Sequence, residues 1–186
     1  MQLVNIDKKY MDSIKKIEIR IPDYNYGKNA YKPFFGELFK LEDIAYVTQI
    51  SSPKIKHDKM KDNKDFKKII DKNNNSLLGV VNLNYMFPVP NKLYNYIDPY
   101  DIEKYRKFEN DLQKFKYINL LIKELKIINE EKIDISAKKL YDFVKLNKES
   151  YIAKRCFDFI RLNEFAKKYI DKALNLNNVK NKDIER

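Results

Sequence analysis

The sequence predicts a single α+β domain: a twisted, antiparallel, partly closed β-sheet core with flanking helices and a helix-rich C-terminal half. Short apolar runs bounded by turn-forming residues fill residues 1–90, whereas apolar residues recur every three or four positions after residue 98. Strands followed by helices, rather than strict alternation, are typical of α+β folds. The 186 residues contain no internal repeat, so we expect one domain over 1–186, with a frayed tail at 177–186.

The chain is expected to open with a strand and a helix. "QLVNI" (2–6) predicts the strand, and Asp7 is a suitable N-cap for the helix that follows. The expected buried stripe of this helix consists of Tyr10, Met11, Ile14 and Ile17.

Four further strands are expected before residue 91. "PFFGELFKL" (33–41) and "AYVTQI" (45–50) are separated by three residues, which predicts a hairpin. A polar, lysine-rich segment (51–76) follows. "LLGVVNL" (77–83) then predicts a buried strand, and "YMFPVP" (85–90) predicts a strand that ends in prolines.

The second half predicts three amphipathic helices. Asp98 and Pro99 supply an N-cap and a first-turn proline for a long one. Its apolar stripe is Ile102, Tyr105, Phe108, Leu112, Phe115, Ile118, Ile122 and Leu125. Ser136 is expected to cap the second helix and Asp158 the third. Each helix needs one buried face, so we assign these stripes to the core rather than to a membrane or a cofactor.

The charge points to a polyanionic partner. The net charge is +11, and lysines that neutralise phosphates gain affinity by releasing counterions, which favours nucleic acid. The cations are 33 Lys and 5 Arg, and an AT-rich genome also enriches Lys, Asn, Ile and Tyr without any selection for binding. Charge alone therefore leaves both explanations open.

Several classes of protein are disfavoured. Cys156 is the only cysteine, which prevents an internal disulfide and suits a reducing cytoplasm. The sequence lacks a secretory signal and an 18-residue apolar span, so we expect a cytoplasmic protein without membrane association. The three glycines form neither a Walker loop nor a dinucleotide fingerprint, and HExxH, CxxC and GxSxG are absent. We expect neither a metal nor a cofactor.

One cluster of polar residues carries chemistry. If the predicted hairpin forms, Lys32 at the start of one strand lies beside Ser51 and Ser52 at the end of the other. Lys54, Lys56 and the only histidine, His57, follow directly. Cations that stabilise charge on phosphate oxygens, with hydroxyls that orient the ribose 2′-hydroxyl, are what RNA cleavage by transesterification requires.

Each member of this cluster also has a structural explanation. Ser51-Ser52-Pro53 is a common way to end a strand, and lysines usually form a solvated face. His57 in a loop is usually exposed polar surface. Only the convergence of these residues favours a catalytic role.

Four stretches, in order, resemble the ToxN/AbiQ family of type III toxins: "IDKKYMDSIKKI", "YKPFFGEL", "YVTQISSPKIKH" and "LLGVVNLNYMFPVP". The last is the most distinctive, because Gly79 through Val89 follow the family pattern G-x-[VIL]-N-x-x-x-M-[IF]-P-[VI]. These stretches span residues 2–90, and "CFDFIRLNEF" (156–165) is similar to a later element of the family.

The resemblance implies a role for several residues. It places Ser52 on the catalytic serine, and Lys32 and Tyr10 on an active-site lysine and tyrosine. Either Tyr26 or Tyr31 would fill a second tyrosine position, with a shifted spacing. The predicted catalytic residues are therefore Ser52, Lys32, Lys54 and Tyr10, and the predicted RNA-binding residues are Ser51, Lys56, His57, Tyr31, Lys28 and Lys59.

The resemblance also implies an activity and partners. The expected protein is a metal-independent endoribonuclease toxin that leaves a 2′,3′-cyclic phosphate and acts in phage defence by abortive infection. Its partners would be cellular or phage RNA substrates and a repeated pseudoknot RNA antitoxin, in a cyclic protein–RNA hetero-oligomer. The alternative is a non-catalytic module that clamps and stacks single-stranded RNA.

Overall fold

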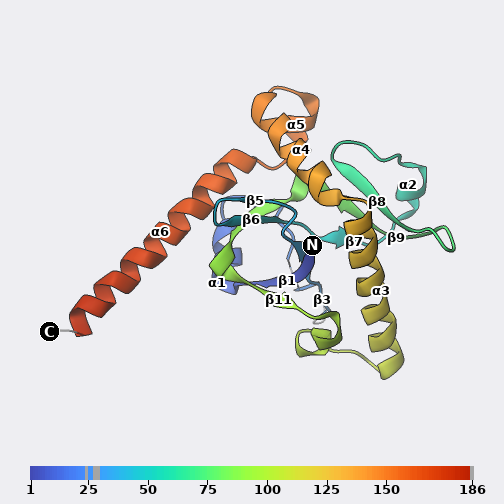
Figure 1. The fold of residues 1–186 in the computed structure, drawn as a ribbon, viewed down its shortest axis with the longest axis horizontal. Helices are drawn as coiled ribbons and strands as arrows, with labels where there is room; N and C mark the ends of the chain where they lie inside the picture. Colours follow the sequence, from blue (N-terminus) through green and yellow to red (C-terminus); the bar gives the residue numbers. More distant parts are fainter. Residues whose placement is uncertain (24, 27–29, 185–186) are drawn as a thin grey trace.

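The structure, a computed structural model, describes residues 1–23, 25–26 and 30–184. At its centre lies segment 44–51, which contains β6 (Ile44–Val47) and β7 (Ile50–Ser51). Every residue from 44 to 50 is buried. Figure 1 shows the segment surrounded by other strands and by helices on both sides.

This central segment has strand partners along both edges. On one edge β5 (Lys40–Leu41) pairs with β6, and Phe35 in β4 (Phe34–Gly36) bridges Thr48. On the other edge β10 (Phe87–Pro90) pairs with β6, and β9 (Ser76–Asn82) pairs with β7. The predicted hairpin is confirmed, although its first strand is divided into β4 and β5. The division follows Glu37, whose φ of 57° interrupts the extended backbone.

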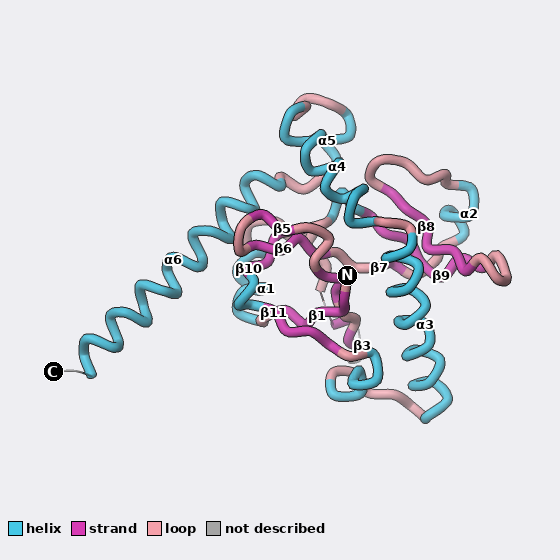
Figure 2. The backbone as a smooth tube through the Cα atoms, in the orientation of Figure 1, coloured by secondary structure: helices cyan, strands magenta, loops and turns pink. Residues whose placement is uncertain are grey.

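The remaining strands extend the sheet outwards. β1 (Gln2–Ile6) pairs with β4 and with β11 (Tyr94–Ile97), while β8 (Phe66–Asp71) pairs with β9. A separate pair is formed by β2 (Asn25–Tyr26) and β3 (Ala30–Tyr31). All of these pairs are antiparallel, as predicted (Figure 2).

Helices α1 (Lys8–Ile14) and α6 (Phe159–Ile184) pack against each other and onto the sheet. The predicted caps Asp7 and Asp158 are confirmed, since they accept hydrogen bonds from the Tyr10 and Arg161 amides. Phe159, Leu162 and Ala166 are buried, and the Tyr169 ring lies 5.1 Å from that of Tyr10. The C-terminal part of α6 extends away from the body (Figure 1).

Helix α3 (Asp111–Glu130) packs on β8 and β9, and Lys123 donates to Asp71 Oδ2 at 2.7 Å. α4 (Ile133–Leu146) and α5 (Tyr151–Arg155) follow α3, and the short α2 (Ile55–Lys59) directly follows β7. Within the described ranges, no helix has the length and apolar character needed to cross a membrane.

Two predicted helix starts were wrong. The long helix begins at Asp111 because Asn110 accepts the Gln113 amide hydrogen bond at 2.9 Å and so becomes the N-cap. Asp98 caps only a 3-10 helix, Pro99–Lys104. Ser136 lies inside α4, which starts after Lys132 with its φ of 49°.

The polar stretches also contain more regular structure than predicted. Segment 51–76 holds both α2 and β8, and neither β11 nor α5 was predicted. Helix α6 continues as far as Ile184, and the fraying of segment 177–186 stays a prediction. Residues 159–184 contain no Gly or Pro, so no residue breaks the helix.

Gly36 allows β4 to approach β1 closely. A methyl group there would lie 2.6 Å from Val4 Cγ1, and Val4 is fully buried. We predict that Gly36→Ala lowers the free energy of unfolding by about 1–3 kcal/mol, through overpacking. Urea denaturation measures this, and Val4→Ala serves as the second arm of a double-mutant cycle. If the clash is the cause, the double variant loses less stability than the sum of the two single variants.

Candidate functional site

The candidate site lies where β7 ends. Ser51 is the last residue of the strand, is half-buried and pairs with Val80 of β9. The next step of this register places Ser52, which is exposed, at the level of Gly79. Two consecutive hydroxyls therefore follow directly from the buried segment 44–50.

Lys32 lies beside this strand end. The Phe35–Thr48 bridge is antiparallel, so the same register brings Lys32 opposite Ser51. Gln49 Nε2 donates to the Lys32 carbonyl oxygen at 3.1 Å and holds that backbone in place. This register agrees with the predicted position of Lys32 beside the strand end at Ser51 and Ser52.

The Glu124 side chain, from α3, lies against the backbone of Gly79 in β9, close to the end of β7. A methyl group on Gly79 would lie 3.1 Å from Glu124 Oε1 and 3.3 Å from the Ser51 carbonyl oxygen. The glutamate is only 6% exposed. Ile50 Cγ2 lies closer still, so the absence of a side chain at position 79 makes room for Ile50 as well as for the buried Glu124 carboxyl group near the end of β7.

Burial shifts the titration of both ionisable groups. It raises the pKa of Glu124 to about 8, although the positive charge of Lys32 opposes this shift. It also lowers the pKa of Lys32, and the charge of Arg106 lowers it further while Glu124 raises it. A carboxyl and an amine with shifts in these directions exchange protons near neutral pH more readily than exposed groups do.

Arg106 supplies a second cation on this side of the cluster. Its Nη1 donates to the Tyr31 carbonyl oxygen at 3.2 Å, one residue before Lys32. Its guanidinium lies over the Tyr117 ring, 4.3 Å from the centroid. Cation–π contact and the hydrogen bond fix its position.

A small pocket of about 70 Å³ opens beside Ser51. Residues from distant parts of the chain line it: the polar residues are Arg20, Thr48, Gln49, Ser51, Asn82 and Tyr85, and Pro22 completes the lining. Tyr85 is 41% exposed and packs on Phe157, with 5.2 Å between ring centroids. Such a ring offers a surface on which a nucleobase can stack.

The lysines predicted to contact RNA surround α2, directly after the serines. Lys54, Lys56 and Lys59 are exposed. His57 is instead buried against Phe66, and its Nδ1 accepts a hydrogen bond from the Lys54 amide at 3.1 Å. Burial, together with Lys56 and Lys54, lowers the pKa of His57. The histidine therefore stabilises the turn that presents the lysines.

The predicted tyrosines lie below the surface. Tyr10 is fully buried, and its hydroxyl donates to the Pro88 carbonyl oxygen at 2.7 Å. Tyr31 is buried and donates to Asn5 Oδ1. Both support the sheet in this structure, and we do not include them among the groups that reach RNA. Lys28 lies outside the described residues, as does the side chain of Tyr26.

A metal centre is not formed by the residues that the structure describes, because no three His, Cys, Asp or Glu side chains gather closely enough to hold an ion.

Sequence reasoning missed Glu124, Arg106, Arg20 and Tyr85. One signal for Glu124 was available, since it falls in the buried stripe of α3 between Leu121 and Ile128. A carboxylate at a core-facing position is rarely tolerated without a specific reason.

Comparison with known families decides the affiliation. The family described as "Toxin ToxN, type III toxin-antitoxin system" matches residues 2–167. The chain belongs to the ToxN family. The match extends from β1 into α6 and so includes every element that contributes to the candidate site. No curated protein sequence matches the chain.

Three solved structures share the ToxN-family fold of this chain, each with a TM-score of 0.70. One, from a bacterial antiviral system regulated by a processed non-coding RNA, is 22% identical over 90% of this chain and 98% of its own. Another, from work on selective toxin inhibition by a non-coding RNA pseudoknot, is 23% identical over 90% and 96%. AbiQ, a lactococcal anti-phage endoribonuclease of the type III toxin–antitoxin system, is 23% identical over 91% and 98%.

Glu124 makes stability depend on pH. Its pKa is about 8 in the folded chain against an ordinary value of 4.5, so the folded state binds the extra proton between these values. Stability should therefore fall as pH rises from 4.5 towards 8. We predict that Glu124→Gln removes much of this decline, which melting temperatures across the pH range can show. The exposed Glu164→Gln is the control; an equal change in both variants would contradict the assignment.

Proposed function

We propose that this ToxN-family chain is an endoribonuclease toxin that cleaves RNA at the end of β7. The proposal is supported by the register of β7, which puts the strand end at Ser51 and Ser52 near Gly79, with the buried Glu124 carboxyl group and Lys32 close by. Family membership supports it, and so does the similarity to AbiQ, an anti-phage endoribonuclease.

In the proposed reaction the RNA provides its own nucleophile. The ribose 2′-oxygen forms a bond to phosphorus, and its proton passes to the Lys32 amine, whose neutral form is favoured by burial. The bond from phosphorus to the 5′-oxygen breaks, and that oxygen receives the proton from the Lys32 ammonium so formed. The buried Glu124 would adjust the charge of Lys32 without touching RNA. The products are a 2′,3′-cyclic phosphate and a 5′-hydroxyl, and a metal ion has no required role.

The other groups would bind and orient. The Ser52 hydroxyl hydrogen-bonds the phosphate or the ribose rather than attacking it, and Lys54 stabilises charge on the phosphorane. A base next to the scissile bond stacks on Tyr85 in the pocket beside Ser51. The non-catalytic alternative, a module that only clamps single-stranded RNA, uses the same cations without proton transfer.

Purified protein incubated with bulk RNA and EDTA tests the proposal. We predict cleavage that survives chelation and leaves cyclic phosphate ends, detected by mass spectrometry. Ser52→Ala and Lys32→Met should each slow cleavage by about 10²-fold or more, because each removes a preorganised polar contact. Ser51→Ala should have a milder effect.

Circular dichroism must show that each of these variants is folded. Intact RNA with retained binding would favour the clamping module instead. Fragments with 5′-phosphates, formed only with magnesium, would exclude transesterification. A folded Ser52→Ala protein with full activity would remove that serine from the mechanism.

We also propose an RNA antitoxin, made of pseudoknot repeats, that occupies the same site in a cyclic assembly with the protein. The chain carries a net charge of +11, and the exposed Lys54, Lys56 and Lys59 follow the strand end at and within α2. The related system with a pseudoknot inhibitor supports the class of partner. A role in phage defence rests on the relatives from antiviral systems.

The antitoxin complex should dissociate with salt, with a log–log slope of about −0.7 per neutralised phosphate. We predict that Lys54→Glu and Lys56→Glu weaken binding strongly, because each charge reversal adds repulsion, whereas Ser52→Ala still binds. Lys172→Glu on α6, far from α2 in Figure 1, is the control. Protease and RNase treatment of a co-purified complex identify the neutralising molecule, and a protein inhibitor would overturn this proposal.

A further inference from the structure

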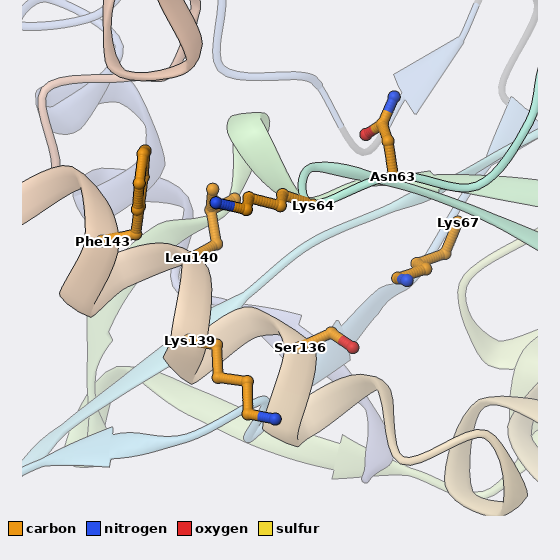
Figure 3. A pocket seen from close by; sticks show the side chains of 7 residues that line it. All are labelled: Asn63, Lys64, Lys67, Ser136, Lys139, Leu140 and Phe143. Atoms are coloured by element: carbon orange, nitrogen blue, oxygen red, sulfur yellow. The ribbon is translucent and has the colours of Figure 1, made fainter. Parts of the chain in front are cut away.

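A second positively charged pocket lies away from the strand end, between α4 and the start of β8. Its volume is about 400 Å³. We call it the lysine pocket, and its lining is Asn63, Lys64, Lys67, Ser136, Lys139, Leu140 and Phe143. Figure 3 shows that Asn63, Lys64 and Lys67 come from the β8 side of the pocket. Ser136 and Lys139 come from α4.

The charge in this pocket is not balanced by carboxylates. Its lining contains three lysines and no acidic residue. Elsewhere lysines are often paired: the neighbouring Lys138, for example, donates to Asp142 at 2.6 Å. Among the described residues no carboxylate lies within ion-pair distance of Lys64, Lys67 or Lys139. Figure 3 shows the three ammonium groups directed to different places around the pocket, so their summed charge without counter-charge is what favours a bound anion.

The remaining lining suits a nucleotide strand rather than a bare ion. Leu140 and Phe143 give the pocket an apolar wall. The Lys64 ammonium lies over the Phe143 ring, 4.1 Å from its centroid, which orients that cation. The Ser136 hydroxyl adds a donor. The Asn63 side-chain oxygen already accepts from the Asp65 and Phe66 amides, so its NH2 group is the part left to donate to a ligand.

The sheet connects this pocket to the strand end. Lys67 pairs with Val81 of β9, and Val81 pairs with Ile50 of β7, so the three residues form one cross-strand row. Gly79 and Val81 alternate onto the same face of β9, so Lys67 shares this face with Glu124. Two strand spacings separate Lys67 from β7, about 10 Å. Val81 and Ile50 are buried in the core, so an RNA strand would follow the mostly exposed segment 52–64 instead of this row, and a few nucleotides cover the distance.

We propose that the lysine pocket binds phosphate groups of the RNA strand a few nucleotides away from the scissile bond. This inference rests on the proposed function, because RNA is taken as the ligand. Lys67 and Lys139 would contact phosphate oxygens, Lys64 would add a fixed charge, and Ser136 and Asn63 would donate hydrogen bonds. The pocket would thereby make the protein prefer longer single-stranded RNA over short fragments.

The test compares RNA lengths in the Ser52→Ala background, where binding is measured without cleavage. Fluorescence anisotropy reports the affinity for single-stranded RNA of about 4 and about 16 nucleotides. The triple variant Lys64→Gln/Lys67→Gln/Lys139→Gln should lose about tenfold or more in affinity for the longer RNA and much less for the shorter. Its salt slope for the longer RNA should fall by about 2, as expected when three cations that neutralise phosphates are removed.

Two further triple variants make the result specific. Lys9→Gln/Lys168→Gln/Lys172→Gln removes the same charge from exposed positions on α1 and α6 and should leave the length preference intact. Replacing the three pocket lysines by Arg keeps the charge and should retain most of the affinity. The inference would be overturned if both triple Gln variants lost the same affinity for the longer RNA. It would also be overturned if the pocket variant lost affinity equally for both RNA lengths.

Failure of the proposed function gives a different result. If the chain binds RNA without cutting it, and the length preference still depends on the pocket lysines, the catalytic proposal fails while this inference stands. If the chain cuts RNA and the variant with all three pocket lysines replaced by Gln keeps the full preference for longer RNA, only this inference is wrong.

Discussion

The fold depends on one buried segment, residues 44–51, whose backbone must find hydrogen-bond partners along both edges. Water cannot reach these amides, so each unpaired group would destabilise the fold. β4 and β5 satisfy one edge, and β9 and β10 satisfy the other. Stretches on both sides of the segment in sequence are thereby brought together at the point where it ends. Ser51 and Ser52 owe their position to this pairing, since they follow the last fully buried residue, Ile50.

A second constraint acts at Gly79. Burying a carboxyl group opposes folding unless a compensating group lies close. A side chain at position 79 would clash with Ile50 and would also crowd Glu124 between α3 and β9. Lys32 provides part of the compensation, and burial favours the neutral form of both groups. Such an arrangement destabilises the fold locally, and active sites commonly do so. The same helix also forms the Lys123–Asp71 ion pair on β8, which holds its register against the sheet.

Much of this could be predicted from the sequence, because local patterns determine it. The hairpin predicted that Lys32 lies beside Ser51, and the caps Asp7 and Asp158 were predicted correctly. β8 was missed because Lys67 and Lys68 interrupt its apolar pattern. Asp98 and Asn110 can both cap a helix, and the local sequence does not decide which of them starts the long one. In the structure Asn110 caps α3 and Asp98 caps only the 3-10 helix. Glu124 meets β9 only through the packing of α3 on the sheet, which is a tertiary property.

The attachment of the serines to the rigid segment 44–50 has a consequence for regulation. An inhibitor can act allosterically only on an element that has two arrangements of similar free energy. A strand end held by neighbours on both sides, with Gln49 securing the Lys32 backbone, offers no such alternative. If the proposed site cleaves RNA, it is competent as soon as the chain has folded. The proposed antitoxin would then act by covering the site, so the degree of inhibition would follow the relative amounts of protein and RNA and would need no change of conformation.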